Sequence, residues 1–242
     1  MRMPFDFTGR TVLVTGVGRP RQIGEAMARA FGEAGANLVV CDVNAVGVAE
    51  RAADFEAQGI RARPAAGDLT EPDVARNAVD TALEAFGRLD VVVNLAGGLT
   101  TYGPFEAATP AMIERELAIN LRTAISVSQA ALPALEASRG CLVNFASIAF
   151  FEPAPNLAIY AAAKAAVAGL TRSLAVEWQP RGIRVNAVAP GMVRTADNVA
   201  AAGTAAPYVE LADLTSGVLF LASDAAAGIT GLLLPITPRP SA

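Results

Sequence analysis

The sequence predicts an α/β fold in which one parallel sheet of about seven strands is covered by helices on both faces. Three observations predict it. The chain has 242 residues, a length that fits one domain. Short apolar runs alternate with longer helical patterns along the whole chain, as in strand–helix–strand crossovers. No charge block or low-complexity linker divides the chain, so we expect one doubly wound domain of the Rossmann type over residues 1–242.

The expected strands are short runs that are continuously apolar, which is the pattern of strands buried on both faces of a parallel sheet. They cover 11–15, 37–41, 60–64, 89–93, 141–145, 183–188 and 232–236, of which 60–64 is the weakest. Helical patterns lie between them at 22–35, 45–58, 71–86, 109–136, 158–179 and 210–222. Four glycines just past helices predict left-handed C-terminal caps: Gly35, Gly59, Gly87 and Gly182.

The composition excludes several classes of function. There is no histidine, which excludes Ser-His-Asp and Cys-His nucleophile systems and any His-ligated metal, and we expect no metal site. The net charge of −4 offers no basic footprint for nucleic acid. No stretch of 18 apolar residues lacks a charge and no secretory signal is visible, so we expect no membrane span and a cytoplasmic protein. Cys41 and Cys141 lie in apolar runs and are expected to be buried free thiols.

The turn after the first expected strand has the features of a dinucleotide site. The strand ends at Thr15-Gly16, and the next helix opens near Ile23-Gly24, so backbone N–H groups and the positive helix end can face a pyrophosphate. The G-x-G-x-x-G fingerprint fails, because Arg21 stands at its third glycine. Taken alone, the loop fits an ordinary tight turn about equally well.

Asp42 strengthens the dinucleotide hypothesis. It ends the second expected strand 18 residues after Gly24, where an acidic residue hydrogen-bonds the adenosine ribose. A carboxylate there repels a 2′-phosphate, so we expect NAD(H), with NADP(H) as the less favoured alternative. Two observations leave the question open: Asp42 could cap the helix that begins near Asn44, and Arg19 or Arg21 could reach a 2′-phosphate.

The helical segment 158–179 carries a candidate proton donor. Tyr160 and Lys164 are four residues apart and share one helix face. A neighbouring ammonium favours the phenolate and lowers the pKa of a phenol, so Tyr160 could exchange a proton with a carbonyl or an alcohol oxygen. Lys164 is the only lysine among 19 basic residues, which argues against a chance pair. Ser147, just past the expected strand 141–145, could hydrogen-bond the reacting oxygen, although such a serine is usually a turn or cap residue.

These residues together resemble a classical short-chain dehydrogenase/reductase over nearly the whole chain. Each match is weak alone, but their order and spacing make the resemblance specific. The matching positions are Thr15-Gly16, Ile23-Gly24, Asp42, Asp68-Leu69, Asn94 to Gly97, Asn120, Ser147, Tyr160, Lys164, Pro190-Gly191 and Thr195.

The resemblance implies a role for each matching position. Tyr160 is the expected general acid/base, Lys164 lowers its pKa and binds the nicotinamide ribose, Ser147 orients the substrate oxygen, and Asn120 holds a water that links Lys164 to solvent. Asp68 is expected to contact adenine, and Pro190, Gly191 and Thr195 to flank the nicotinamide carboxamide. The full expected set of cofactor contacts is Gly16, Gly18, Arg19, Gln22, Ile23, Asp42, Asp68, Leu69, Asn94, Ala96, Gly97, Tyr160, Lys164, Pro190, Gly191, Val193 and Thr195. Family members are commonly tetramers, so we expect a homo-oligomer, a tetramer or a dimer, paired through the helices that match 109–136 and 158–179.

Several departures from the family's pattern stand out. The glycine loop is two residues longer and has Gln22 in place of the middle glycine, and Leu95 replaces a second asparagine. The segment 196–210, where the family carries a longer substrate lid, is short and rich in small residues, which suggests mobility. Pro235 to Pro238 stand where the family has Val-Asp-Gly-Gly.

The expected substrate pocket is apolar. Its candidate residues follow the strand ends nearest Tyr160: Gly98, Leu99, Phe150, Phe151, Leu157 and Met192. Alternatively, Phe150 and Phe151 only pack under the lid. Arg194 could meet one anionic group of a substrate.

Three hypotheses about function follow. The leading one is an NAD(H)-dependent oxidoreductase that interconverts a small secondary alcohol or diol and a ketone, with Tyr160 as general acid/base. The second is an NADPH-dependent enzyme like 3-oxoacyl-carrier-protein reductase, against which Asp42 and the acidic balance argue. The third is a catalytically silent dinucleotide-binding regulator, against which the complete set of Asn120, Ser147, Tyr160 and Lys164 argues.

Overall fold

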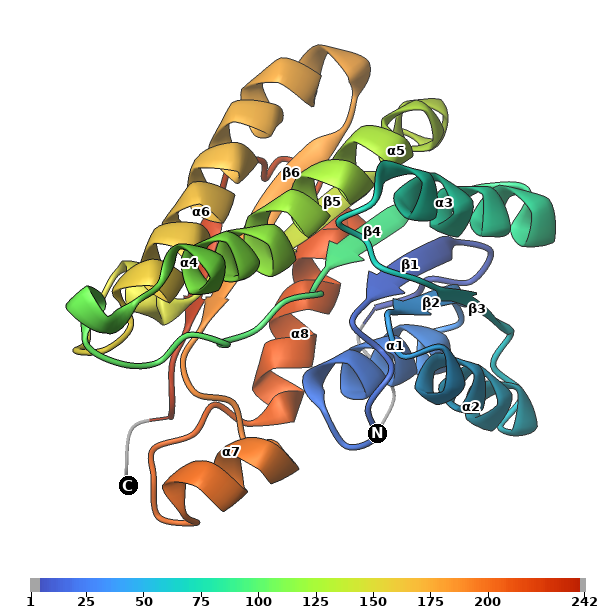
Figure 1. The fold of residues 1–242 in the computed structure, drawn as a ribbon. Coiled ribbons are helices and arrows are strands. Elements are labelled where there is room, and N and C mark those ends of the chain that lie inside the picture. Colours follow the sequence, from blue (N-terminus) through green and yellow to red (C-terminus); the bar gives the residue numbers. More distant parts are fainter. Residues whose placement is uncertain (1–4, 240–242) are drawn as a thin grey trace.

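The computed structural model describes residues 5–239 and shows a single seven-stranded sheet in which every pair of neighbours is parallel (Figure 1). The strand order is β3-β2-β1-β4-β5-β6-β7. The strands are β1 (Thr11–Thr15), β2 (Asn37–Asp42), β3 (Ala62–Ala66), β4 (Val91–Asn94), β5 (Cys141–Phe145), β6 (Arg184–Pro190) and β7 (Leu233–Ile236). The predicted fold class is confirmed, and each predicted strand is present with its ends shifted by at most two residues.

Helices cover both faces of this sheet, as predicted (Figure 1). One layer holds α1 (Ile23–Glu33), α2 (Ala45–Ala57) and α8 (Leu211–Ala222). The other holds α3 (Pro72–Phe86), α5 (Thr123–Ser138) and α6 (Ala158–Trp178), with α4 (Pro110–Leu117) packed against α6. Large side chains such as Phe31, Phe55 and Leu214 fill the first core, and Val79, Leu135 and Trp178 lie in the second.

The predicted helix over 109–136 is interrupted. A π-helical turn, Ala118–Arg122, separates α4 from α5 and carries Asn120. Such turns insert an extra residue into a helix and occur often at functional sites. The four predicted glycine caps are confirmed, because Gly35, Gly59, Gly87 and Gly182 all have positive φ angles between 74° and 94°.

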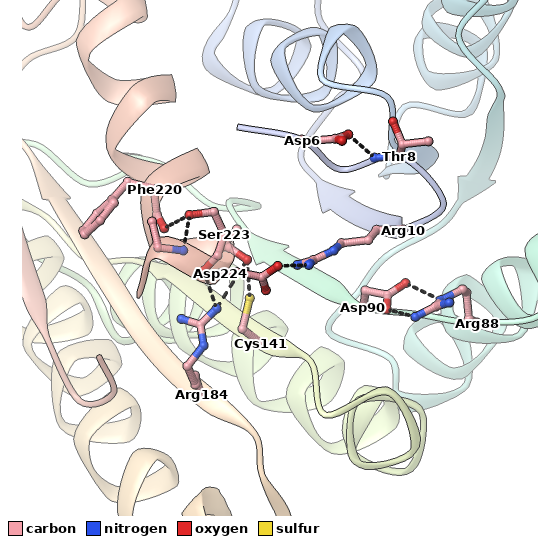
Figure 2. Close-up of polar contacts among 12 residues, drawn as sticks. Asp6, Thr8, Arg10, Arg88, Asp90, Cys141, Arg184, Phe220, Ser223 and Asp224 are labelled. Atoms are coloured by element: carbon pink, nitrogen blue, oxygen red, sulfur yellow. Dashed lines mark hydrogen bonds and ion pairs between the residues drawn. The ribbon is translucent and has the colours of Figure 1, made fainter. Parts of the chain in front are cut away.

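Hydrogen bonds and an ion pair connect the amino-terminal edge of the sheet to the end of α8 (Figure 2). Arg184 of β6 donates to three backbone carbonyls at the end of α8, those of Leu221, Ala222 and Ser223, at 2.6, 3.3 and 3.2 Å. Arg10 pairs with Asp224 just beyond that helix. Because the last carbonyls of a helix have no partner within it, these contacts stabilise the end of α8 against β6 and β1.

The segment 196–210 is more ordered than its composition suggests. It contains the short helix α7 (Ala196–Ala202), capped by the Thr195 hydroxyl, which accepts a hydrogen bond from the Asn198 N–H at 3.3 Å. The hydroxyl of the buried Tyr208 lies within hydrogen-bond distance of the backbone carbonyls of Asn198 and Gly203, at 3.0 and 2.6 Å. The small residues of this segment suggested mobility, and the sequence interpretation missed the hydrogen bonding of Tyr208 that orders it.

Both cysteines are buried free thiols, as predicted. Burial raises the pKa of Cys41 to about 12 and that of Cys141 to about 11, so neither is a reactive thiolate at neutral pH. Within residues 5–239, no group of acidic or cysteine side chains is placed to hold a metal ion. No helix in the same part of the chain is long and apolar enough to cross a membrane.

Candidate functional site

A cavity of about 610 Å³ opens at the carboxyl edge of the sheet, beside the point where the strand order reverses between β1 and β4. In open α/β sheets, ligands bind in the crevice at this reversal. The loops after β1, β2, β3 and β4 and the start of the π-helical turn line it. Its residues are Gly16, Arg19, Gln22, Ile23, Gly24, Asp42, Val43, Gly67, Asp68, Leu69, Thr70, Leu95, Ala96, Gly97, Arg115, Ala118, Ile119 and Thr123.

The glycine-rich loop after β1 is packed so closely that there is no space for a side chain at Gly24. Gly16 has a φ of 80°, and a Cβ on Gly24 would lie 2.0 Å from the Gly16 carbonyl oxygen. Arg21, at the place of the fingerprint's third glycine, takes a left-handed φ of 57°, and its N–H donates to Glu25 at 2.5 Å. The loop thus keeps the tight path of a phosphate-binding turn although its glycine pattern is imperfect, and it fits the pyrophosphate of a dinucleotide.

Asp42 is held at the mouth of this cavity by two backbone donors. Its Oδ2 accepts from the Gly18 N–H at 2.7 Å, and its Oδ1 accepts from the Asn44 N–H at 2.9 Å. The alternative role, a cap of α2, belongs instead to the Asn44 side chain, which accepts from the Gly47 N–H at 3.1 Å. The carboxylate therefore has a fixed position at the end of β2, as the ribose-binding role requires.

The two arginines that could favour a 2′-phosphate are placed differently. Arg19 lines the cavity but forms an ion pair with Asp197 of α7. Arg21 is exposed and does not line the cavity. Val43, which follows Asp42 and does line it, is 71% exposed and carries no charge. The sequence interpretation missed Val43 and also Arg115 of α4 as cavity-lining residues.

Asp68, Leu69, Ala96 and Gly97 all line the cavity, as the resemblance implies. Asn94 does not. Its side chain is buried, and its Nδ2 donates to Asn144 of β5 at 3.0 Å on the sheet face covered by α5. The alternation of side chains along β4 explains this, because Val92, two residues earlier, faces the same layer.

The residues after β6 lie beyond this cavity. Pro190 ends the strand, Gly191 donates its N–H to Ile236 of β7 at 2.9 Å, and Val193 pairs with Val209 in an isolated parallel bridge. The buried Thr195 caps α7. These residues share the carboxyl edge of the sheet but do not line that cavity, and neither do four other predicted cofactor contacts, Gly18, Asn94, Tyr160 and Lys164.

The predicted catalytic side chains converge at the carboxyl end of β5. Ser147 follows that strand, is buried, and accepts the Ala149 N–H at 3.2 Å, which fixes its oxygen. Tyr160 and Lys164 come from the first turns of α6. The buried Lys164 Nζ donates to the Phe145 carbonyl at 2.8 Å and lies 5.8 Å from the centroid of the Tyr160 ring.

The electrostatics differ from the sequence expectation. Burial raises the pKa of Tyr160 above its ordinary value; the Ser147 hydroxyl lowers it, and the carboxylate of Glu116 raises it further. Lys164 is not among the causes of this shift. Burial also lowers the pKa of Lys164 to about 8, although the nearby carboxylate of Glu116 raises that pKa. The free protein thus keeps Tyr160 as a protonated phenol at neutral pH, a form that can donate a proton.

Asn120 is buried beside the loop that follows β4. Its Nδ2 donates to the Gly98 carbonyl at 2.9 Å, and its Oδ1 accepts from the Gly98 N–H at 3.1 Å. Its Nδ2 also donates to Oε1 of Glu116 at 3.0 Å. Sequence interpretation missed Glu116. Its spacing of four residues before Asn120, on one helix face, was the available sign.

Exposed apolar side chains lie in the segments that follow β4, β5 and β6, and we call them the apolar rim. The loops 98–105 and 151–157 that carry part of it are joined by a hydrogen bond from the Gly103 N–H to the Asn156 carbonyl at 3.2 Å. Phe150 and Phe151 are 36% and 44% exposed. The rim consists of Leu99, Tyr102, Phe105, Phe150, Phe151 and Met192.

Comparisons with known proteins agree with this architecture. A family profile described as short chain dehydrogenase matches residues 10–204. The chain is 36% identical to cis-4-hydroxycyclohexanecarboxylate dehydrogenase of Sinomonas cyclohexanicum, over 95% of this chain and 96% of that protein. It is also 36% identical to 2,5-dichloro-2,5-cyclohexadiene-1,4-diol dehydrogenase LinX of Sphingobium indicum, over 94% of each.

A solved structure shares the fold closely. It is a 7α-hydroxysteroid dehydrogenase complexed with NADH and 7-oxo glycochenodeoxycholic acid, with a TM-score of 0.88 and 28% identity over 96% of this chain and 94% of that one. The family match over most of the sequence, the relatives and the shared fold lead to one conclusion: the chain is an oxidoreductase that belongs to the short-chain dehydrogenase/reductase family.

Proposed function

We propose that this enzyme interconverts a secondary alcohol, or one hydroxyl of a diol, and the corresponding ketone with NAD(H), and that Tyr160 is its general acid/base. The observation that carries the proposal is the convergence of Tyr160, Ser147 and Lys164 at the sheet edge that also bears the glycine-rich loop and Asp42. A bound nicotinamide supplies or accepts the hydride.

Side chains of the protein donate and accept the proton in this reaction. In ketone reduction, the Tyr160 phenol donates its proton to the carbonyl oxygen as that oxygen gains negative charge, and in alcohol oxidation the same oxygen of Tyr160 takes the proton back. The Ser147 hydroxyl hydrogen-bonds the reacting oxygen and stabilises its developing charge. Once the proton has moved, the ammonium of Lys164, 5.8 Å from the centroid of the Tyr160 ring, is the positive charge placed to offset the phenolate.

The preference for NAD(H) over NADP(H) is supported by the charges around the ribose position. Asp42 is a fixed carboxylate there, and Val43 beside it offers no cation. The guanidinium of Arg19 is paired with Asp197. A 2′-phosphate at this position would therefore meet the fixed negative charge of Asp42, while Arg19 is engaged by Asp197, which disfavours NADP(H).

The apolar rim supports an alicyclic or similarly apolar substrate. Ligand pockets of this kind are mainly apolar, with a few polar groups that fix orientation. Arg194, which we expected to be able to meet an anionic group, is engaged by Glu210 at 2.8 Å and stacks on Tyr208 with its guanidinium carbon 4.5 Å from the ring centroid. The two relatives named as dehydrogenases of cis-4-hydroxycyclohexanecarboxylate and of a dichlorocyclohexadiene diol are both named for alicyclic alcohols. We also propose, from the family resemblance, a cytoplasmic homo-oligomer, a tetramer or a dimer.

A panel of alicyclic and linear secondary alcohols and their ketones, each assayed with NAD(H) and NADP(H), tests the proposal. We expect turnover of alicyclic alcohols with NAD⁺. Reduction of 3-oxoacyl thioesters with NADPH would favour the carrier-protein reductase hypothesis instead. Tight NADH binding without turnover of any compound would favour a silent regulator.

A further inference from the structure

Glu116 is an internal charge that the proposed mechanism does not use. Three charged side chains are buried among residues 5–239, namely Asp90, Glu116 and Lys164, and Glu116 is fully inaccessible. Asp90 pairs with Arg88. None of the ion pairs within those residues includes Glu116 or Lys164. These two side chains of opposite charge are thus buried outside any ion pair, and a buried charge is costly unless its surroundings compensate it.

The hydrogen-bond partners of Glu116 suit a carboxylate. Its Oε2 accepts from both the N–H and the hydroxyl of Thr100, at 3.0 and 2.6 Å. Its Oε1 accepts from the Asn120 Nδ2 at 3.0 Å. A carboxylate is an acceptor only and satisfies this set, whereas a glutamine amide would place N–H groups against other N–H groups. The donors around Glu116 therefore stabilise a negative charge.

This charge is close to the catalytic pair. Glu116 lies in the last turn of α4, which packs against α6, the helix of Tyr160 and Lys164. Glu116 raises the pKa of both side chains, as a nearby negative charge does. Apart from these three titratable groups, the neighbouring loops contribute the hydroxyls of Ser147 and Thr100, and Arg115 on α4 is exposed toward the cofactor cavity.

The same carboxylate also fixes local geometry. Together, Glu116 and Asn120 hold the backbone of Gly98 and Thr100, which continues from the cavity wall at Gly97 to the apolar rim at Leu99. Loss of the carboxylate therefore affects both the charge balance and the position of this loop.

We propose that Glu116 is a positioning residue of the catalytic site, whose fixed negative charge keeps Lys164 in its ammonium form and whose hydrogen bonds hold Asn120 and the loop 98–100 in place. The proposal rests on the function proposed for Tyr160 and Lys164, but its central claim concerns one amine and can be measured without turnover.

Lys164 is the only lysine, so protein labelled with ¹³C,¹⁵N-lysine gives one side-chain NMR signal to titrate in the cofactor-free enzyme. We expect the Lys164 signal of the unmodified enzyme to titrate near pH 8. In Glu116→Gln the midpoint should fall by about one pH unit, the size expected for one nearby charge in a protein interior. Glu116→Asp keeps the negative charge, so its Lys164 midpoint should lie close to that of the unmodified enzyme. Glu114→Gln, on the exposed side of the same helix, is the matched control and should leave it unchanged.

The pH dependence of catalysis provides a second readout. Because the loss of Glu116 lowers the pKa of both Tyr160 and Lys164, the alkaline limb of ketone reduction should move to lower pH in Glu116→Gln. A purely structural role would lower kcat without moving that limb. Should Glu116→Gln fail to fold, the double variant Glu116→Leu/Thr100→Val removes the charge together with its hydroxyl partner and makes the same prediction. An unchanged Lys164 midpoint in a folded variant without the carboxylate overturns the proposal, whether or not a substrate has been found.

Discussion

The backbone N–H of Gly18 donates a hydrogen bond of 2.7 Å to the Asp42 carboxylate, so the glycine-rich loop after β1 and the end of β2 are fixed to each other. A Cβ on Gly18 would lie 2.5 Å from the same carboxylate. The two residues therefore depend on each other: the glycine lets the carboxylate approach, and the carboxylate orders the loop. This arrangement places a negative charge at the position proposed for the adenosine ribose.

Removing that charge should change the cofactor preference. In Asp42→Ser/Val43→Arg, we expect the ratio of kcat/KM with NADP⁺ to kcat/KM with NAD⁺ to rise by about 100-fold, equivalent to about 3 kcal/mol. Repulsion of the 2′-phosphate is lost, and an exposed arginine now lines the cavity. Asp68→Asn is the control, since Asp68 lines the same cavity at the proposed adenine position. An unchanged ratio in the double variant would remove Asp42 as the basis of NAD(H) selection.

The path of the glycine-rich loop should be sensitive to a single methyl group. Gly24→Ala places a Cβ 2.0 Å from the Gly16 carbonyl oxygen, so the loop must move, and we expect NADH affinity to fall by more than about tenfold. Gly169→Ala in α6 is the matched control: no atom beyond the neighbouring backbone of the same helix lies within 4 Å of the added carbon, and alanine stabilises a helix interior by about 0.5–1 kcal/mol. Thermal unfolding and NADH titration measure both effects. Normal NADH affinity in Gly24→Ala would show that the loop does not bind the pyrophosphate.

Lys164 should make stability depend on pH. Its pKa is lowered to about 8 in the folded protein but keeps its ordinary value near 10.5 when unfolded. Between these values the unfolded state binds more protons, so the contribution of Lys164 to the free energy of unfolding rises with pH. The difference in that free energy between the unmodified enzyme and Lys164→Met should rise by about 2–3 kcal/mol from pH 7.5 to 10.5. Urea denaturation at several pH values measures it, and parallel curves for the two proteins would contradict the lowered pKa.

The sequence predicted positions along the chain better than directions of side chains. The apolar runs and glycine caps predicted the sheet, because they report burial on both faces and a left-handed backbone. Since all strands are parallel, their carboxyl ends share one edge, and Asp42 and Ser147 were correctly expected there. The family resemblance implied that Asn94 lines the cofactor groove, whereas the alternation along β4 turns its side chain into the interior.

Other features depend on contacts between distant segments and have no local pattern. Glu116 looks like one more acidic residue on an amphipathic helix, and its burial depends on Thr100 from another loop. The order of the segment 196–210 depends on Tyr208, whose hydroxyl reaches back to the backbone of Asn198 and Gly203. Arg19 was considered for a 2′-phosphate, and only the folded chain brings it to Asp197.

The most direct test of the account replaces the phenol of Tyr160 by a phenyl ring and measures NADH binding and turnover in the same preparation. The loss of the proton donor should lower kcat by about 10²–10⁴-fold, the usual contribution of general acid–base catalysis. NADH affinity, measured by fluorescence titration, should stay within about threefold, because the cavity that includes Asp42 is unchanged. Turnover in Tyr160→Phe equal to that of the unmodified enzyme would show that another group moves the proton and would contradict the proposed mechanism.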